Sequence, residues 1–423
     1  MPARRPAALG AAALFLIAMA CDTPPPPTGT LHTDSAGVPI ATAVTPLSPP
    51  GEAWTVGELL AEIGTIDGPP EYQFADVVAA VRLENGGIVV ADRGASELRS
   101  YDAEGNFQWR TGGEGEGPGE FRQLDYLGRM AGDSLVTYDP TLLRIQVFDE
   151  GGRLSHTLRA ELPRDVGSPG GSAADRAVGM AGDRLIIRFV ELNDEATTGI
   201  ARWIDYRLVA VDLQDGAATS LIVVDGEEVE LRGGDGGGYS ENYYVFGNMP
   251  EFGAAAGTIA VIDTEAYRVR LVSALDGATE RIIRREVAPR AVTDAVFEAE
   301  LDGIVEMVFP NPDAAPAGEV DMFRRMWRGY TRAPVLPVLR SVQVDAQGSV
   351  WVAPFHLAGA DPAPFDVFAP DGTWLGTVAL PPGLVRAYIH YRSPYLEIGG
   401  DYVLGVWTGE LDVQYVRMYR LHR

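Results

Sequence analysis

Short apolar segments recur along the chain, and each is followed by a tight loop and a second apolar segment. The first segment of a copy ends in an acidic or aromatic residue, and the second closes on an acid and a glycine. Short apolar runs bounded by turn residues predict paired β-strands. The clearest copies are Gly87–Asp92 with Leu98–Gly105, Asp133–Asp139 with Arg144–Gly151, and Gly257–Asp263 with Arg268–Gly277, and looser copies are Asp183–Gly216, Gly348–Gly372 and Gly400–Leu421.

Six copies at this spacing predict an all-β fold, a six-bladed β-propeller, because a single such blade cannot bury its own faces. The alternating segment Trp54–Ile63 stands before the first complete copy. We expect it to pair with the C-terminal segment Val413–Leu421 and so close the ring, which would leave no long strand edge exposed.

One region breaks the repeat and predicts a small helical insertion over residues 291–330. Thr293–Val308 has apolar residues near helical spacing and is stopped by Pro310, and Glu319–Arg328 is a second helical candidate. The insertion either packs against the propeller for stability or forms a cap over the axial opening or a docking surface. The apolar anchors of the second interpretation are Met322, Phe323, Met326 and Trp327.

The N-terminus has the pattern of an export signal. Arg4 and Arg5 precede an apolar run over residues 7–20 that is short for a membrane span and ends in small residues before Cys21. The stretch Ile17-Ala-Met-Ala-Cys21 resembles a bacterial lipobox, with an ordinary cleaved signal peptide as the alternative. We therefore expect a signal peptide over residues 1–20, a lipidated Cys21 and Pro-rich tether over 21–50, and the propeller over 51–423. This organisation predicts a protein of a bacterial cell envelope, held in the lipid membrane by acylated Cys21 on the periplasmic or outer surface.

Composition narrows the chemistry. Cys21 is the only cysteine and lysine is absent, which excludes disulfides, Cys-ligated zinc, Schiff-base chemistry and a P-loop lysine from the folded part. The formal net charge of -25 makes nucleic acid an unsuitable partner. The five histidines show no pair at metal-binding spacing. We thus expect no cofactor, with Ca²⁺ or another divalent metal at the axis as the alternative, and we assign no catalytic residue and no metal ligand.

The links between repeats are also patterned. Residues 63–74 form a Gly-rich link ending in Phe74, and residues 111–121 form another that ends in Phe121. Asp139 is followed five residues later by Arg144-Ile145, and Asp263 is followed at the same distance by Arg268-Val269. With these links and this spacing, the chain resembles the NHL-repeat propellers, in particular six-bladed bacterial lipoproteins. The first repeat departs from this pattern at Glu97. The resemblance implies a fold but selects no chemistry, because such propellers include protein binders, RNA binders and a few enzymes.

Several motifs have a structural and a functional interpretation. Asp92, Asp139 and Asp263 either line a cation site or accept backbone N–H bonds from the turns that follow them. Arg144 and Arg268 either bind a ligand or pair with acids and loop carbonyls. We favour the structural interpretation in each case.

In the topology that the resemblance implies, the loops after each second strand lie on the same face of the propeller as the Gly-rich links. We expect this face to hold a mostly acidic rim of candidate ligand-binding residues, namely Arg93, Glu114, Glu116, Glu191, Glu265, His356 and Glu410. The leading hypothesis is a non-catalytic, membrane-tethered binding module for a protein, a glycan or a cationic small molecule. The alternative is a metal-dependent hydrolase or lyase of the six-bladed lactonase-like type.

Overall fold

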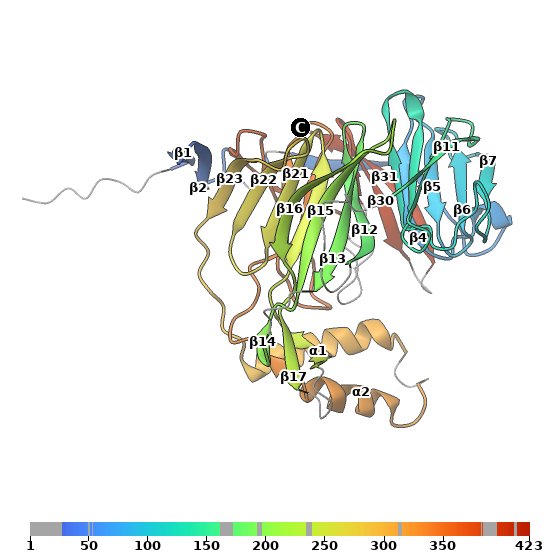
Figure 1. The fold of residues 1–423 in the computed structure, drawn as a ribbon. Helices are drawn as coiled ribbons and strands as arrows, with labels where there is room; N and C mark the ends of the chain where they lie inside the picture. The colour runs from blue at the N-terminus through green and yellow to red at the C-terminus, as the bar shows by residue number, and fades with distance from the viewer. Residues whose placement is uncertain are drawn as a thin grey trace, which may run out of the picture.

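The computed structural model describes residues 28–49, 51–52, 54–160, 172–192, 197–233, 239–311, 315–381, 383, 396–409 and 413–423. Strands dominate these residues, and two α-helices lie together at one end of the strands (Figure 1). The all-β prediction is confirmed. No helix in this part of the chain is long and apolar enough to cross a membrane. Cys21, the expected signal peptide and the start of the tether lie outside the described residues.

The described residues form four sheets of four antiparallel strands and one ten-stranded sheet that contains two further four-stranded antiparallel meanders. We count each meander as a sheet and number the six by the chain order of their first strands. The first three sheets are β4 Val77–Arg82, β5 Ile88–Asp92, β6 Glu97–Tyr101 and β7 Phe107–Gly112; β8 Tyr126–Arg129, β9 Leu135–Asp139, β10 Arg144–Phe148 and β11 Leu154–Arg159; and β12 Ser172–Ala181, β13 Arg184–Leu192, β15 Ile204–Asp212 and β16 Ala218–Asp225. The other three are β20 Pro250–Ala255, β21 Thr258–Asp263, β22 Arg268–Ser273 and β23 Thr279–Arg285; β25 Leu339–Val344, β26 Val350–Pro354, β27 Phe365–Phe368 and β28 Trp374–Val378; and β29 Leu396–Ile398, β30 Tyr402–Thr408, β31 Gln414–His422 and β3 Thr55–Ile63.

Each repeat found in the sequence is the central hairpin of one sheet, so the prediction of paired strands is confirmed. In the sixth sheet β3 pairs antiparallel with β31, and Ile63 lies opposite Val416. This is the predicted pairing of the two terminal segments. A single parallel pair, Gly179 with Ala254, also connects the third sheet to the fourth.

Neighbouring sheets pack face to face through separate clusters of buried apolar side chains. Each of these clusters contains residues from different sheets, for example the pairs Leu98 and Leu135, Ile145 and Ile187, Leu208 and Ile259, Val269 and Val352, Trp351 and Val403, and Leu404 and Val90. Four-stranded meanders that pack in this succession make the fold a β-propeller.

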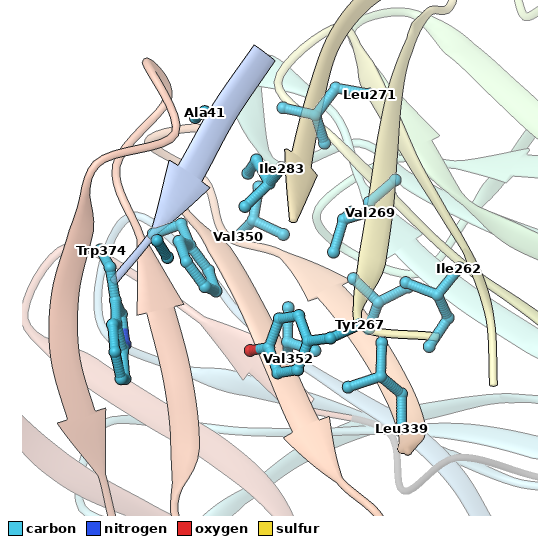
Figure 2. Packing of buried hydrophobic residues seen from close by; sticks show 14 residues of the cluster. Ala41, Ile262, Tyr267, Val269, Leu271, Ile283, Leu339, Val350, Val352 and Trp374 are labelled. Atoms are coloured by element: carbon cyan, nitrogen blue, oxygen red, sulfur yellow. The ribbon is translucent and has the colours of Figure 1, made fainter. Parts of the chain in front are cut away.

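Residues 30–43 of the predicted tether are ordered into strands. β1 Thr30–Ser35 and β2 Val38–Ala43 form a hairpin, and β2 pairs in parallel with β23, the outer strand of the fourth sheet. Ala41 is fully buried between this sheet and Trp374 of the fifth (Figure 2). Residues 30–43 of the expected 21–50 tether are thus part of the fold, because the hairpin covers apolar side chains that two outer strands would otherwise expose.

The predicted helical insertion is present as α1 Asp294–Val308 and α2 Glu319–Arg328. Thr293 caps α1, since its hydroxyl accepts a hydrogen bond from the Val296 N–H at 3.3 Å. Both helices pack with segments from other links in a core of their own. We call this unit the cap; it also contains β19 Tyr244–Val245 and β24 Thr331–Arg332. A separate three-stranded sheet of β14 Gly199–Ala201, β17 Val229–Gly233 and β18 Tyr239–Asn242 lies beside it (Figure 1). The 3-10 turns are η1 Pro70–Tyr72 and η2 Ala131–Asp133.

The cap's packing favours the structural interpretation of the insertion. Trp327 is buried in the cap core, and Phe323 packs partly buried beside it. Met322 and Met326 are 60% and 47% exposed, so only two of the four expected anchors face solvent. The residues that line the cavity described below come from the sheets and their links, not from α1 or α2.

Candidate functional site: a cavity between the first strands

The first strands of all six sheets, β4, β8, β12, β20, β25 and β29, line one cavity of about 600 Å³. Much of the lining is small or apolar, such as Ala177, Ala255 and Val342. Charged and amide side chains interrupt it, among them Asp125, Arg176, Glu251, Gln343 and Glu397. A cavity of this size, whose lining is almost as polar as it is apolar, can hold a small polar molecule.

Ion pairs occupy the end of the cavity at which the first strands begin. Arg176 of β12 lies 3.3 Å from Glu251 of β20. Asp175 accepts a hydrogen bond from Arg188 Nε at 2.6 Å. Burial acts to lower the pKa of Arg176, but the carboxylates of Glu251, Asp175 and Asp125 outweigh it and raise that pKa. The acids at this end are each paired with an arginine.

Glu397 of β29 lines the cavity beside the end of β4. Its Oε2 accepts a hydrogen bond from the backbone N–H of Arg82 at 2.6 Å, and the Tyr402 hydroxyl donates to the same carboxyl group. Burial raises the pKa of Glu397 to about 7, and the Arg82 N–H, the Tyr402 hydroxyl and the charges of Arg129 and Arg82 offset only part of that effect. The carboxyl group is consequently half-protonated near neutral pH.

The two arginines nearest Glu397 are engaged elsewhere. Arg82 lies 3.4 Å from Asp401 and stacks over the Tyr402 ring at 4.7 Å. Arg129 lies 2.9 Å from Asp133. Within the described part of the chain Glu397 makes no ion pair, whereas the lining acids Asp125, Asp175 and Glu251 each have one.

Of the predicted rim residues, Arg93 comes nearest to this cavity. Its guanidinium lies 3.6 Å from the cavity-lining carboxylate of Asp125, and its Nε donates to Asp76 at 2.7 Å. Arg93 thus helps to hold a wall residue, with its side chain 29% exposed.

Two predicted rim acids are held in local ion pairs. Glu191 is 8% exposed and accepts hydrogen bonds from Arg207 at 2.6 and 2.9 Å. Glu116 lies 3.0 Å from Arg122. These partners reduce the negative charge that the acidic rim was expected to present.

The remaining rim residues are scattered among separate loops. Glu114 and Glu265 are exposed, and His356 Nδ1 lies 3.1 Å from the Leu357 carbonyl oxygen. Glu410 lies outside the described residues. Ligand binding by the rim stays a prediction.

The strand-end acids follow their structural interpretation. The Asp139 carboxylate accepts backbone N–H bonds from Arg122, Gln123 and Leu142 at 2.7, 2.9 and 3.0 Å. The Arg144 guanidinium donates to the carbonyl oxygen of Glu116 at 2.8 Å. Among the residues that the structure describes, no group of three or more His, Cys, Asp or Glu side chains is placed to hold a metal ion.

Sequence reasoning missed Glu397, Arg129 and Arg176. Glu397 stands between Leu396 and Ile398 in a short apolar strand, and a lone acid in such a run was the available signal. No local motif surrounds it, because the partners of its carboxyl group come from β4, β8 and β30.

Comparisons with known proteins concern the overall fold. A putative exported protein from Bacteroides fragilis is 10% identical over 91% of this chain and 100% of its own, with a TM-score of 0.45. The calcium-binding protein regucalcin from Agrobacterium tumefaciens is 12% identical over 89% and 97%, with a TM-score of 0.39. A streptogramin B lyase is 11% identical over 88% and 100%, with a TM-score of 0.40. At these identities and TM-scores the similarities carry no argument about a ligand or a reaction. No protein-family model and no curated protein matches the sequence.

Proposed function

We propose that this protein is a non-catalytic, extracytoplasmic binding module, a closed six-bladed propeller of the NHL-like type anchored through acylated Cys21, which takes a small ligand in its central cavity. One observation carries the proposal: six first strands from distant parts of the chain line a single cavity of about 600 Å³. A volume in this range can enclose a drug-sized molecule.

The polar groups of the cavity support binding over chemistry. Asp125, Asp175 and Glu251 are each held by a different arginine, and Gln343 adds an amide to the wall. Groups fixed in this way can orient a polar ligand. The membrane, through Cys21, is the proposed partner at the N-terminus, and a protein or a glycan on the rim remains a proposal alongside the cavity ligand.

The test compares ligand stabilisation of the full chain with that of a variant whose cavity is filled. Ala255→Trp places a large side chain in the wall of the cavity, and Leu275→Trp adds the same side chain at a position that is 68% exposed. A library of polar small molecules should contain ligands that raise the melting temperature of the native chain and of Leu275→Trp but not that of Ala255→Trp.

Elemental analysis of the purified protein addresses the competing function. A stoichiometric divalent metal that is lost in Ala255→Trp would contradict the non-catalytic proposal and favour the metal-dependent hydrolase or lyase. Ligands that stabilise Ala255→Trp as well as the native chain would instead contradict binding in the cavity.

A further inference from the structure

We infer that Glu397 anchors a cationic ligand: a small organic molecule with an ammonium group binds in the cavity with that group against the Glu397 carboxylate. The inference rests on the proposed function, because it assigns a chemical class to the ligand of the same cavity. The geometry that supports it is the placement of Glu397 in the wall, where the Arg82 N–H holds Oε2 at 2.6 Å.

Charge balance around the cavity identifies Glu397 as the group that lacks a counter-ion. The other lining acids are paired with Arg93, Arg188 and Arg176. Glu397 has no ion pair in the described part of the chain, so the guanidinium groups of Arg82 and Arg129 balance the charge of its ionised form only in part. A bound cation would supply the missing counter-charge.

The groups that face Glu397 come from three strands. β4 contributes the backbone N–H and the guanidinium of Arg82, β30 contributes the Tyr402 hydroxyl, and β8 contributes the charge of Arg129 and the nearby phenol of Tyr126. The Arg82 and Arg129 guanidinium groups lie within ion-pair distance of Asp401 and Asp133, which limits their repulsion of a cation.

An organic ammonium group suits this surrounding better than a metal ion does. A calcium ion takes six to eight oxygen ligands, whereas the protein groups closest to the Glu397 carboxyl are N–H and O–H donors. An ammonium group carries a single positive charge, which one ionised carboxylate can balance, and the carboxylate oxygens accept its N–H bonds.

Binding of the cation should be coupled to proton release. Burial raises the pKa of Glu397 to about 7, so a fraction of the free protein carries a proton there at neutral pH. The cation binds the ionised form, and its affinity therefore rises as the pH increases towards 7 and becomes constant above that value.

The experiment measures calorimetric binding to the full chain of benzylamine and of benzyl alcohol, which has the same carbon skeleton without the charge. The variants are Glu397→Gln and, as a matched control, Glu104→Gln, which removes the same charge from the exposed turn between β6 and β7. We expect benzylamine to bind about ten-fold more tightly at about pH 8 than at about pH 6, and benzyl alcohol to bind equally at both. Glu397→Gln should lose about ten-fold in benzylamine affinity at the higher pH, and Glu104→Gln should match the native chain.

Proton counting gives a second measurement that needs no variant. Titrations near pH 7 in buffers of different ionisation enthalpy should show release of a fraction of a proton per benzylamine bound. Proton uptake, unchanged benzylamine affinity in Glu397→Gln, or no preference of the native chain for benzylamine over the alcohol would each overturn the inference. If uncharged molecules bind and Ala255→Trp blocks them, the proposed function stands although the inference fails, and if Ala255→Trp blocks no ligand, the proposed function fails as well.

Discussion

The guanidinium of Arg423, the last residue of the chain, lies 2.7 Å from the buried carboxylate of Asp345. Its Nη2 also donates to the Gly399 carbonyl oxygen at 2.9 Å, and the group stacks over the Trp54 ring at 4.3 Å. Asp345 follows the first strand of the fifth sheet, whereas Arg423 follows β31 of the sixth. One side chain thus connects the C-terminus to the neighbouring sheet.

Arg423→Ala should lower the free energy of unfolding by about 1–3 kcal/mol, because it leaves a fully buried carboxylate without its charge partner. The loss stays below that of an isolated buried charge, since Asp345 also accepts hydrogen bonds from the Ser349 N–H and Trp351 Nε1. Urea denaturation measures the difference. Arg417→Ala is the control, because it breaks a more exposed ion pair with Glu62 and should lower the free energy of unfolding by less than about 1 kcal/mol. An equal loss of stability in the two variants would contradict the role of Arg423.

The N-terminal hairpin should contribute to stability through Ala41. Ala41 is fully buried, and its Cβ faces Gly372 so closely that a Cβ added to Gly372 would lie only 2.5 Å from it. The site therefore has no room for a larger side chain. Ala41→Asp should cost about 2–4 kcal/mol and make residues 28–48 sensitive to proteases, because the variant either buries a charge or detaches the hairpin.

Thr33→Asp is the matched control, since Thr33 is exposed on β1, the edge strand of the hairpin. It should change the free energy of unfolding by less than about 0.5 kcal/mol. Equal stability of Ala41→Asp and Thr33→Asp would contradict the packing of the hairpin.

The attachment of the cap depends on close approach at Gly303. A Cβ at this position of α1 would lie 2.0 Å from the Ala358 carbonyl oxygen, which is backbone and cannot simply rotate away. Gly303→Ala should therefore destabilise the protein by about 1–3 kcal/mol although alanine favours a helix by about 1 kcal/mol. Thermal melting with cap-specific hydrogen exchange would detect the change.

Ala299→Gly provides the opposite control in the same helix. Ala299 is exposed, so the variant should lose only the helix propensity, about 1 kcal/mol. A Gly303→Ala protein more stable than the native chain would show that α1 does not need this contact.

The sequence predicted the elements whose signals are local. The hairpins of the sheets follow from strand pattern and turn residues, and Thr293 and Pro310 mark the ends of α1. β1 and β2 were missed because a Pro- and Thr-containing segment has a weak strand pattern, and its stability comes from contacts with Ile283 and Trp374 far along the chain. The cavity could not be predicted for the same reason, since six separate strands meet there.

The candidate rim illustrates the limit for polar residues. Glu191 and Glu116 were chosen by their place in loops or at strand ends, but pairing with Arg207 and Arg122 depends on sheet register and loop geometry. Composition alone could not indicate which of the cavity-lining acids lacks an ion pair, and this property separates Glu397 from Asp125, Asp175 and Glu251.

The stability of the protein should depend on pH through Glu397. Burial raises the pKa of Glu397 from its ordinary value of 4.5 to about 7, so the folded state holds the proton more tightly than the unfolded chain does. This group therefore stabilises the fold most below pH 4.5, and its contribution is lost as the pH rises from 4.5 to about 7, by roughly 3 kcal/mol at most. Glu397→Gln removes the ionisation while it keeps an acceptor for the Arg82 N–H, so it should gain stability relative to the native chain as the pH rises through this window. Urea denaturation of both proteins at about pH 5 and about pH 8 measures the effect. The control Glu104→Gln should follow the native chain. Parallel pH dependences of Glu397→Gln and the native chain would contradict a buried, weakly acidic Glu397.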